Sequence, residues 1–296
     1  MRRLILIALL GSVAQLVDGT LGMAYGVTAT TALLITGITP AVASAAVHLS
    51  EVGTTLASGL SHWRFGNVDW RVVALIGVPG GVGAFAGATF LSNLSTESAS
   101  LWVAALLILL GVYILARFAT GKIRAVIQGQ VGGRFLGPLG LIAGFVDATG
   151  GGGWGPVATS ALLGSGKLTP RKTVGSVNAA EFIVSVAASL GFLFGLGSEN
   201  IPYGIVAALL IGGVIAAPLA AWLVSRLATQ WLGVGVGLVL ILTNARTLMK
   251  GLEVGTGPRF VVYGVLVGLW AAVVAYGVRR SSLQRVEEKE LETVAA

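Results

Sequence analysis

The chain has 296 residues, of which 55% are hydrophobic and only 10% charged, and its mean hydropathy is +0.89. A soluble domain carries about 25% charged residues, so this composition excludes an ordinary soluble protein and indicates an integral membrane protein. With no cysteine in the sequence, disulfides, thiol catalysis and thiolate-bound metal centres are also excluded. The net charge is +7, and the basic residues lie in short segments between apolar spans. This pattern is typical of charge that sets the orientation of a membrane protein and does not indicate nucleic-acid binding.

The chain begins MRRLILIALLGSVAQ, which imitates a secretory signal peptide. We expect this segment to be retained, because a second copy of it occurs in the interior of the chain. The first half is predicted to form a broken apolar pair followed by three full helices. These are residues 4–17 and 23–37, then 40–62, 70–92 and 98–118. The full helices approach the roughly 20 residues that cross a bilayer, whereas the broken pieces are shorter.

Residues 145–166, FVDATGGGGWGPVATSALLGSG, repeat residues 16–37, LVDGTLGMAYGVTATTALLITG. Thr39-Pro40 likewise aligns with Thr169-Pro170, and each pair predicts a helix that starts at a threonine cap with proline in its first turn. The aligned polar, glycine and aromatic pairs are Asp18 with Asp147, Thr20 with Thr149, Gly22 with Gly151, Tyr25 with Trp154, His48 with Asn178, and Glu51 with Glu181.

The second half is predicted to form the same elements as the first: 135–147 and 154–165, then 169–195, 201–226 and 229–248. One apolar span, 260–278, has no counterpart. The expected organisation is a first repeat (1–120), a basic linker (121–134), a second repeat (135–250), an extra helix (258–280) and a tail (281–296).

Each half makes an odd number of crossings, whether its short pieces re-enter or cross, so the second half is inverted. The fold class is therefore all-α: a polytopic helical membrane protein with two inverted repeats, each a broken hairpin plus three transmembrane helices, and one extra C-terminal helix. Fourteen of the 19 Lys and Arg residues fall on the side that holds the C-terminus. The positive-inside rule then places the C-terminus in the cytoplasm and the N-terminus outside. The Arg2-Arg3 pair argues for the opposite orientation.

Inverted repeats with broken helices are the recurring construction of secondary transporters, whose substrate sits near the midplane. An intramembrane enzyme is the second hypothesis, but the sequence has no HExxH, no GxSxG and no clustered acid pair. A channel with the glycine hairpins as its filter is the third. We therefore expect a transporter and not an enzyme.

Glycines 150–153 and the segment that follows them are the first candidate site. Backbone without side chains can turn sharply and present N–H groups to an anion, and a helix starting at Trp154 aims its positive end there. Tight turning and close packing explain the same glycines. The candidate substrate-binding residues are Thr20, Gly22, Tyr25, His48, Thr149, Gly151, Gly152, Gly153, Trp154 and Asn178.

Four intramembrane carboxylates are the second candidate group. Asp18 and Asp147 either cap the half-helices or handle protons. Glu51 and Glu181 lie near mid-bilayer and are candidates for proton coupling, since desolvation disfavours the charged form; interhelical hydrogen bonding is the structural alternative. His48 and Glu51 as a metal pair lack a third ligand, so no metal and no cofactor are expected.

The segments GFVDATGGGGWGPVATSALL (144–163), GSVAQLVDGTLGMAYGVTATTALL (11–34) and VGSVNAAEFIVS (174–185) resemble the sulfite exporter TauE/SafE family. The first copy departs from the glycine-rich form, with MAYG at 23–26. The resemblance implies export of sulfite, or of an organosulfonate such as sulfoacetate, across the bacterial cytoplasmic membrane. We expect this export to be coupled to protons or the membrane potential. An anion channel or an uptake permease for another small organic anion is the alternative. The expected partners are the small anion and the lipid bilayer, and a homodimer is left open.

Overall fold

A computed structural model describes residues 2–21, 23–120, 129–224 and 229–295, which contain helices and no strand. This confirms the all-α prediction. The elements are α1 (Arg2–Leu21), α2 (Tyr25–Ile35), α3 (Pro40–Arg64), α4 (Trp70–Ser92), α5 (Thr96–Thr120), α6 (Gly133–Gly150), a π-helical turn η1 (Gly155–Thr159) continued by α7 (Ser160–Ser165), α8 (Pro170–Leu196), a 3₁₀ turn η2 (Ser198–Asn200), α9 (Tyr203–Val224), α10 (Thr229–Gly251) and α11 (Thr256–Ala295).

The helices α3 and α8 begin alike, as their Thr-Pro pairs predict. Thr39 and Thr169 are the N-cap residues, and a proline follows each in the first turn. Proline suits this position because its missing N–H would have no partner there. Only Thr169 also caps with its side chain, whose oxygen accepts from the Lys172 amide at 3.4 Å.

Both predicted breaks are present. The second break passes through Gly151 and Gly152, whose φ angles of 67° and 142° are accessible to glycine without strain. The first break instead holds Ala24 at a φ of 97°. After the break, α2 has 11 residues, about 16 Å of helix, which is about half of a bilayer's hydrocarbon core.

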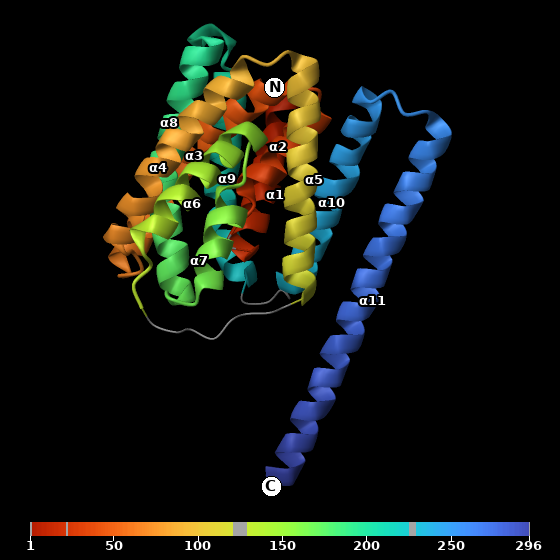
Figure 1. Ribbon diagram of the computed structural model, residues 1–296. Coiled ribbons are helices and arrows are strands. Elements are labelled where there is room, and N and C mark those ends of the chain that lie inside the picture. The colour runs from red at the N-terminus through yellow and green to blue at the C-terminus, as the bar shows by residue number, and fades with distance from the viewer. Residues whose placement is uncertain (1, 22, 121–128, 225–228, 296) are drawn as a thin grey trace.

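The helices pack in pairs, and each pair has a counterpart formed by the matching helices of the other half. α1 packs against α9, and its counterpart α6 packs against α4, the counterpart of α9. In the two remaining pairs, α5 with α10 and α3 with α8, each helix packs against its own counterpart from the other half. Two structurally related halves are expected to produce this pattern. The helix α11 has no counterpart in this pattern. In Figure 1 it lies beside α5 and α10, and its C-terminal end extends past the bundle.

Glycines bring the paired helices into backbone contact, as small residues do where membrane helices pack closely. A Cβ atom on Gly144 of α6 would lie 2.0 Å from the carbonyl oxygen of Gly80 on α4. In the corresponding pair, a Cβ atom on Gly212 of α9 would lie 2.0 Å from the carbonyl oxygen of Ala8 on α1. Only glycine permits these approaches.

Among the described residues, four helices are long and apolar enough to cross a membrane: Trp70–Ser92, Thr96–Ala119, Pro170–Leu196 and Thr256–Ala275. The last continues as helix through the predicted tail to Ala295, because the segment RVEEKELETVA is rich in strong helix formers and contains no breaker. Most of the predicted linker lies outside the described residues.

Candidate functional site

The two breaks meet in the interior of the bundle. A Cβ atom on Gly152 would lie 2.2 Å from the amide nitrogen of Val27, at the start of α2. A Cβ atom on Gly26 would likewise lie 2.6 Å from Cα of Gly152. The hydroxyl of Thr30 donates to the carbonyl oxygen of Gly151. Backbone from one half therefore touches backbone from the other half where both helices are interrupted.

A cavity of about 280 Å³ lies at this junction. Its walls come from both breaks and from α3 and α8. The lining residues are Gln15, Asp18, Met23, Ala24, Tyr25, Gly26, Val27, Glu51, Ser58, His62, Asp147, Gly152, Gly153, Gly155, Pro156, Thr159, Val174, Val177, Asn178 and Glu181. All four predicted carboxylates are among them, and so are Tyr25, Gly152, Gly153 and Asn178.

Asp18 and Asp147 cap the half-helices in the same way. Oδ1 of Asp18 accepts from the Tyr25 amide at 3.1 Å, and Oδ1 of Asp147 accepts from the Trp154 amide at 2.9 Å. Each aspartate thus bridges its own break and satisfies an amide that has no partner within the helix. The capping interpretation describes the geometry of both residues, and their carboxyl groups also reach the cavity.

His48 lies outside the cavity lining and is fully buried. Its Nδ1 is 2.8 Å from the carbonyl oxygen of Ser44, and its Nε2 is 3.2 Å from Oδ2 of Asp147. The Ser44 hydroxyl donates to the carbonyl oxygen of Ala148 at 2.7 Å. His48 was predicted to contact the substrate; it instead joins α3 of the first half to α6 of the second.

Glu51 and Glu181 lie in equivalent helices, α3 and α8, and both line the cavity. Glu51 is only 3% exposed, and its Oε2 has no hydrogen-bond partner. Among the described residues, no Lys or Arg lines the cavity. Four carboxyl groups therefore line the cavity without a compensating Lys or Arg, and burial of ionised carboxylates without such a partner is costly.

Tyr25 and Asn178 provide the neutral polar groups of the wall. The Tyr25 hydroxyl lies 3.3 Å from the Ser50 hydroxyl. The Asn178 amide donates to the carbonyl oxygen of Val174 at 3.0 Å and accepts from Ser58 at 3.2 Å. One N–H of the Asn178 side chain is left for another acceptor.

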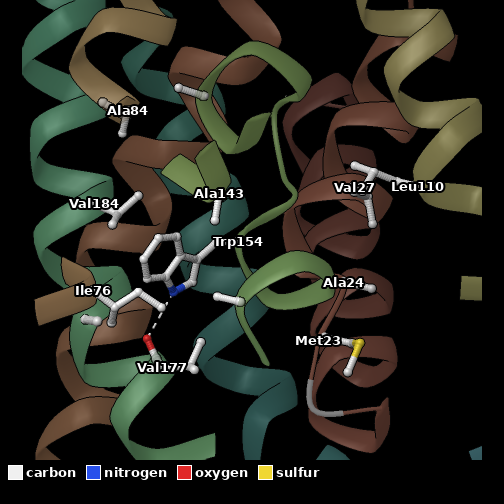
Figure 2. Packing of buried hydrophobic residues seen from close by; sticks show 14 of the residues in the cluster. Met23, Ala24, Val27, Ile76, Ala84, Leu110, Ala143, Trp154, Val177 and Val184 are labelled. Carbon is white, nitrogen blue, oxygen red and sulfur yellow. Dashed lines mark hydrogen bonds between the residues drawn. The ribbon is translucent and has the colours of Figure 1, made fainter. Parts of the chain in front are cut away.

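Three predicted site residues lie away from the cavity in addition to His48. The Trp154 indole points into the apolar core beside Ile76 and Val184 and donates to the carbonyl oxygen of Val177 at 3.1 Å (Figure 2). Its ring occupies the space that the missing side chain of Gly80 leaves, since a Cβ atom there would lie 2.8 Å from the ring.

Thr149 turns its hydroxyl back to the carbonyl oxygen of Phe145 at 2.7 Å, and Gly151 is engaged with Thr30. Local hydrogen bonding therefore removes both of these candidates from the wall. Gly22 lies outside the described residues, and so does the side chain of Thr20.

Sequence reasoning missed several polar wall residues. Ser58 and His62 follow Glu51 by seven and eleven positions on α3, so they share its helical face. This spacing was a signal that could have identified them. Gln15 and Thr159 follow from no comparable pattern.

The structure also adds a third group to the His48–Glu51 pair. His48, Glu51 and Asp147 each offer one ligand atom, and these atoms lie within 4.8 Å of one another. A metal ion and a proton would compete for the same atoms, and the hydrogen bond between Nε2 and Oδ2 already joins two of the three.

Comparison with known proteins agrees with this architecture. Residues 7–247 match the family described as sulfite exporter TauE/SafE. The chain belongs to the sulfite exporter TauE/SafE family. A TauE/SafE relative, the probable membrane transporter protein YtnM of Bacillus subtilis (strain 168), is 49% identical over 278 residues, which are 93% of each chain. No solved structure matches the chain. This TauE/SafE protein is thus a multi-pass membrane transporter and not an enzyme.

Proposed function

We propose that the protein exports a small sulfur-containing anion, sulfite or an organosulfonate such as sulfoacetate, through the cavity between the two breaks. The observation that carries this proposal is the meeting of two helix starts at one cavity. The first turn of α2 (Tyr25 to Val27) lines it, and so do Gly152, Gly153, Gly155 and Pro156 around the start of η1. Helix N-termini present N–H groups and a positive dipole end to an anion.

The available donors suit a small ligand. The Tyr25 and Trp154 amides are already held by Asp18 and Asp147, whereas the amides of Gly26 and Val27 have no partner within their helix turn. A cavity of about 280 Å³ is at the lower limit of ligand sites in general. Sulfite or a two-carbon sulfonate fits this scale.

Coupling to protons follows from the charges of the same cavity. Four carboxyl groups and no described Lys or Arg surround it. An anion that enters while these groups are ionised meets like charge in a low dielectric, where repulsion is strong. Protons must therefore accompany the anion, and the proton gradient is the proposed driving force. The proposed location is the bacterial cytoplasmic membrane, with the C-terminus in the cytoplasm.

The test is flux in proteoliposomes that contain the purified protein, with sulfite, thiosulfate, sulfoacetate or acetate as substrate, with and without a pH gradient. We expect flux of at least one sulfur anion, accelerated by the gradient, and little flux of acetate. If no sulfur anion moves under any gradient, the proposal is wrong. Acetate flux alone would reassign the protein to another class of organic anion.

A further inference from the structure

The His48–Asp147 pair connects the two halves just behind the cavity. Asp147 lines the cavity, whereas His48 does not. Both side chains are at least 98% buried, and Nε2 lies 3.2 Å from Oδ2. The Phe192 ring, 6.0 Å from the imidazole between centroids, covers another side of His48. Any exchange between His48 and cavity water therefore passes through the carboxyl groups in front of it.

The hydrogen bonds of the imidazole determine where its protons lie. Nδ1 lies 2.8 Å from the carbonyl oxygen of Ser44 and 3.3 Å from the Ser44 hydroxyl. The carbonyl oxygen can only accept, and the hydroxyl already donates to the carbonyl oxygen of Ala148, so Nδ1 carries a hydrogen. Nε2 faces a carboxyl oxygen of Asp147. A hydrogen bond between these two atoms requires one proton, either on His48 as an imidazolium or on Asp147 as a carboxylic acid. Without it, two lone pairs would face each other.

Glu51 connects this pair to the cavity. One of its carboxyl oxygens lies within 4.8 Å of a ring nitrogen of His48 and of an Asp147 carboxyl oxygen, and its Oε2 is buried without a partner. Neutral imidazole and two ionised carboxylates would leave two negative charges here, which burial disfavours. The other titratable groups that face the cavity are Asp18 from α1, Tyr25 from α2, His62 from α3 and Glu181 from α8; none is cationic unless His62 is protonated.

We propose that His48 and Asp147 form a proton-binding site, which holds one proton between Nε2 and Oδ2 and exchanges it with the cavity through Glu51. The role of this site in transport rests on the proposed function, for which it names the place where a coupled proton resides. Asp18, the counterpart of Asp147, has no equivalent histidine partner, because Asn178 occupies the position that aligns with His48. An amide cannot carry a proton, so the site is single.

Binding or release of this proton also affects the contact between α3 and the second break. Asp147 holds the proton through Oδ2 and the start of the second half-helix through Oδ1. Loss of the proton turns the His48–Asp147 contact repulsive while the Trp154 amide still holds the other oxygen. Proton release therefore loosens the connection between α3 and the second break, the place where the two halves meet.

A first test needs no transported anion. The chain has two histidines, His48 and His62, so ¹⁵N-histidine NMR in lipid nanodiscs of the His62→Gln variant reports on His48 alone. We expect a single pH titration step in which Nε2 changes while Nδ1 stays protonated. Asp147→Asn should move that step by more than about one pH unit. Glu97→Gln, at an exposed position in the first turn of α5 and outside the cavity lining, should leave it nearly unchanged.

Three results would overturn the site: no step at Nε2, a step that Asp147→Asn leaves unmoved, or about one metal ion per chain in the purified protein. The second test is flux of a sulfur anion by His48→Gln. We expect it to lose the acceleration by a pH gradient, about tenfold or more, while anion exchange without a gradient persists. Full acceleration in this variant would remove His48 from coupling. If the wild type moves no sulfur anion, the proposed function fails, and the NMR result still decides the proton site.

Discussion

Asp18 and Asp147 each accept a hydrogen bond from the amide seven residues later, yet their second oxygens have different surroundings. Oδ2 of Asp147 meets His48, whereas Asn178, the counterpart of His48, binds Ser58 and Val174 instead. The two halves thus share a cap and differ in the group that can hold a proton. At the residue scale, the asymmetry lies in one histidine.

Asn178→Asp tests the proposed anion site at this scale. The substitution keeps the shape of the side chain and places another carboxyl group in the wall. Repulsion at a few ångströms in a protein environment is worth several kcal/mol, so we expect KM for the transported anion to rise at least about tenfold, or about 1.4 kcal/mol. The effect should shrink as the pH falls, because an aspartate loses its charge in acid.

The matched control is Asn93→Asp. Asn93 is exposed at the end of α4 and does not line the cavity. Its KM should stay within about twofold of wild type. Equal effects of the two variants would show that Asn178 does not face the anion.

The broken hairpins are the elements that form the cavity, and glycine contacts hold the helices that carry them. α6 leads into the second break and lies against α4 through Gly140 and Gly144, whose added Cβ atoms would lie 2.2 and 2.0 Å from backbone oxygens of α4. Backbone cannot move aside as a side-chain end can. The position of the second break therefore depends on this helix contact.

Gly144→Ala should separate α4 from α6. Overpacking costs about 1–3 kcal/mol and more where backbone must shift, so we expect a lower melting temperature in detergent and a lower yield of monodisperse protein. Gly133→Ala in the same helix is the control, because its Cβ atom would meet only ordinary contacts at 3.7 Å and beyond. Unchanged melting of Gly144→Ala would contradict the packing described for this pair.

Across the whole molecule, each helix pair has a counterpart made of the matching helices of the other half, and the cavity lies where α3 and α8 meet the two breaks. Inversion of one half against the other is the arrangement that the odd number of crossings predicts. It determines which loops face each side of the membrane.

Cysteine labelling tests this orientation. The natural chain has no cysteine, so single cysteines at the exposed positions Ser95, Ser198 and Lys167 can be labelled without background. We expect an impermeant maleimide to label Ser95→Cys and Ser198→Cys in intact cells, and Lys167→Cys only after permeabilisation. The reverse pattern would place the C-terminus outside, as the Arg2-Arg3 pair suggests.

The sequence by itself determined the all-α class of the described residues, the two breaks and the helix starts at Thr39 and Thr169, because hydropathy, glycine runs and Thr-Pro pairs act locally along the chain. It also predicted four intramembrane carboxyl groups as one candidate group, and all four line one cavity. Only the tertiary structure decided that Trp154 fills the space beside Gly80 and that His48 turns from the cavity to Asp147. Both outcomes depend on contacts between the two halves, since the partners are far apart in sequence and the direction of a side chain is set by the helix packed against it.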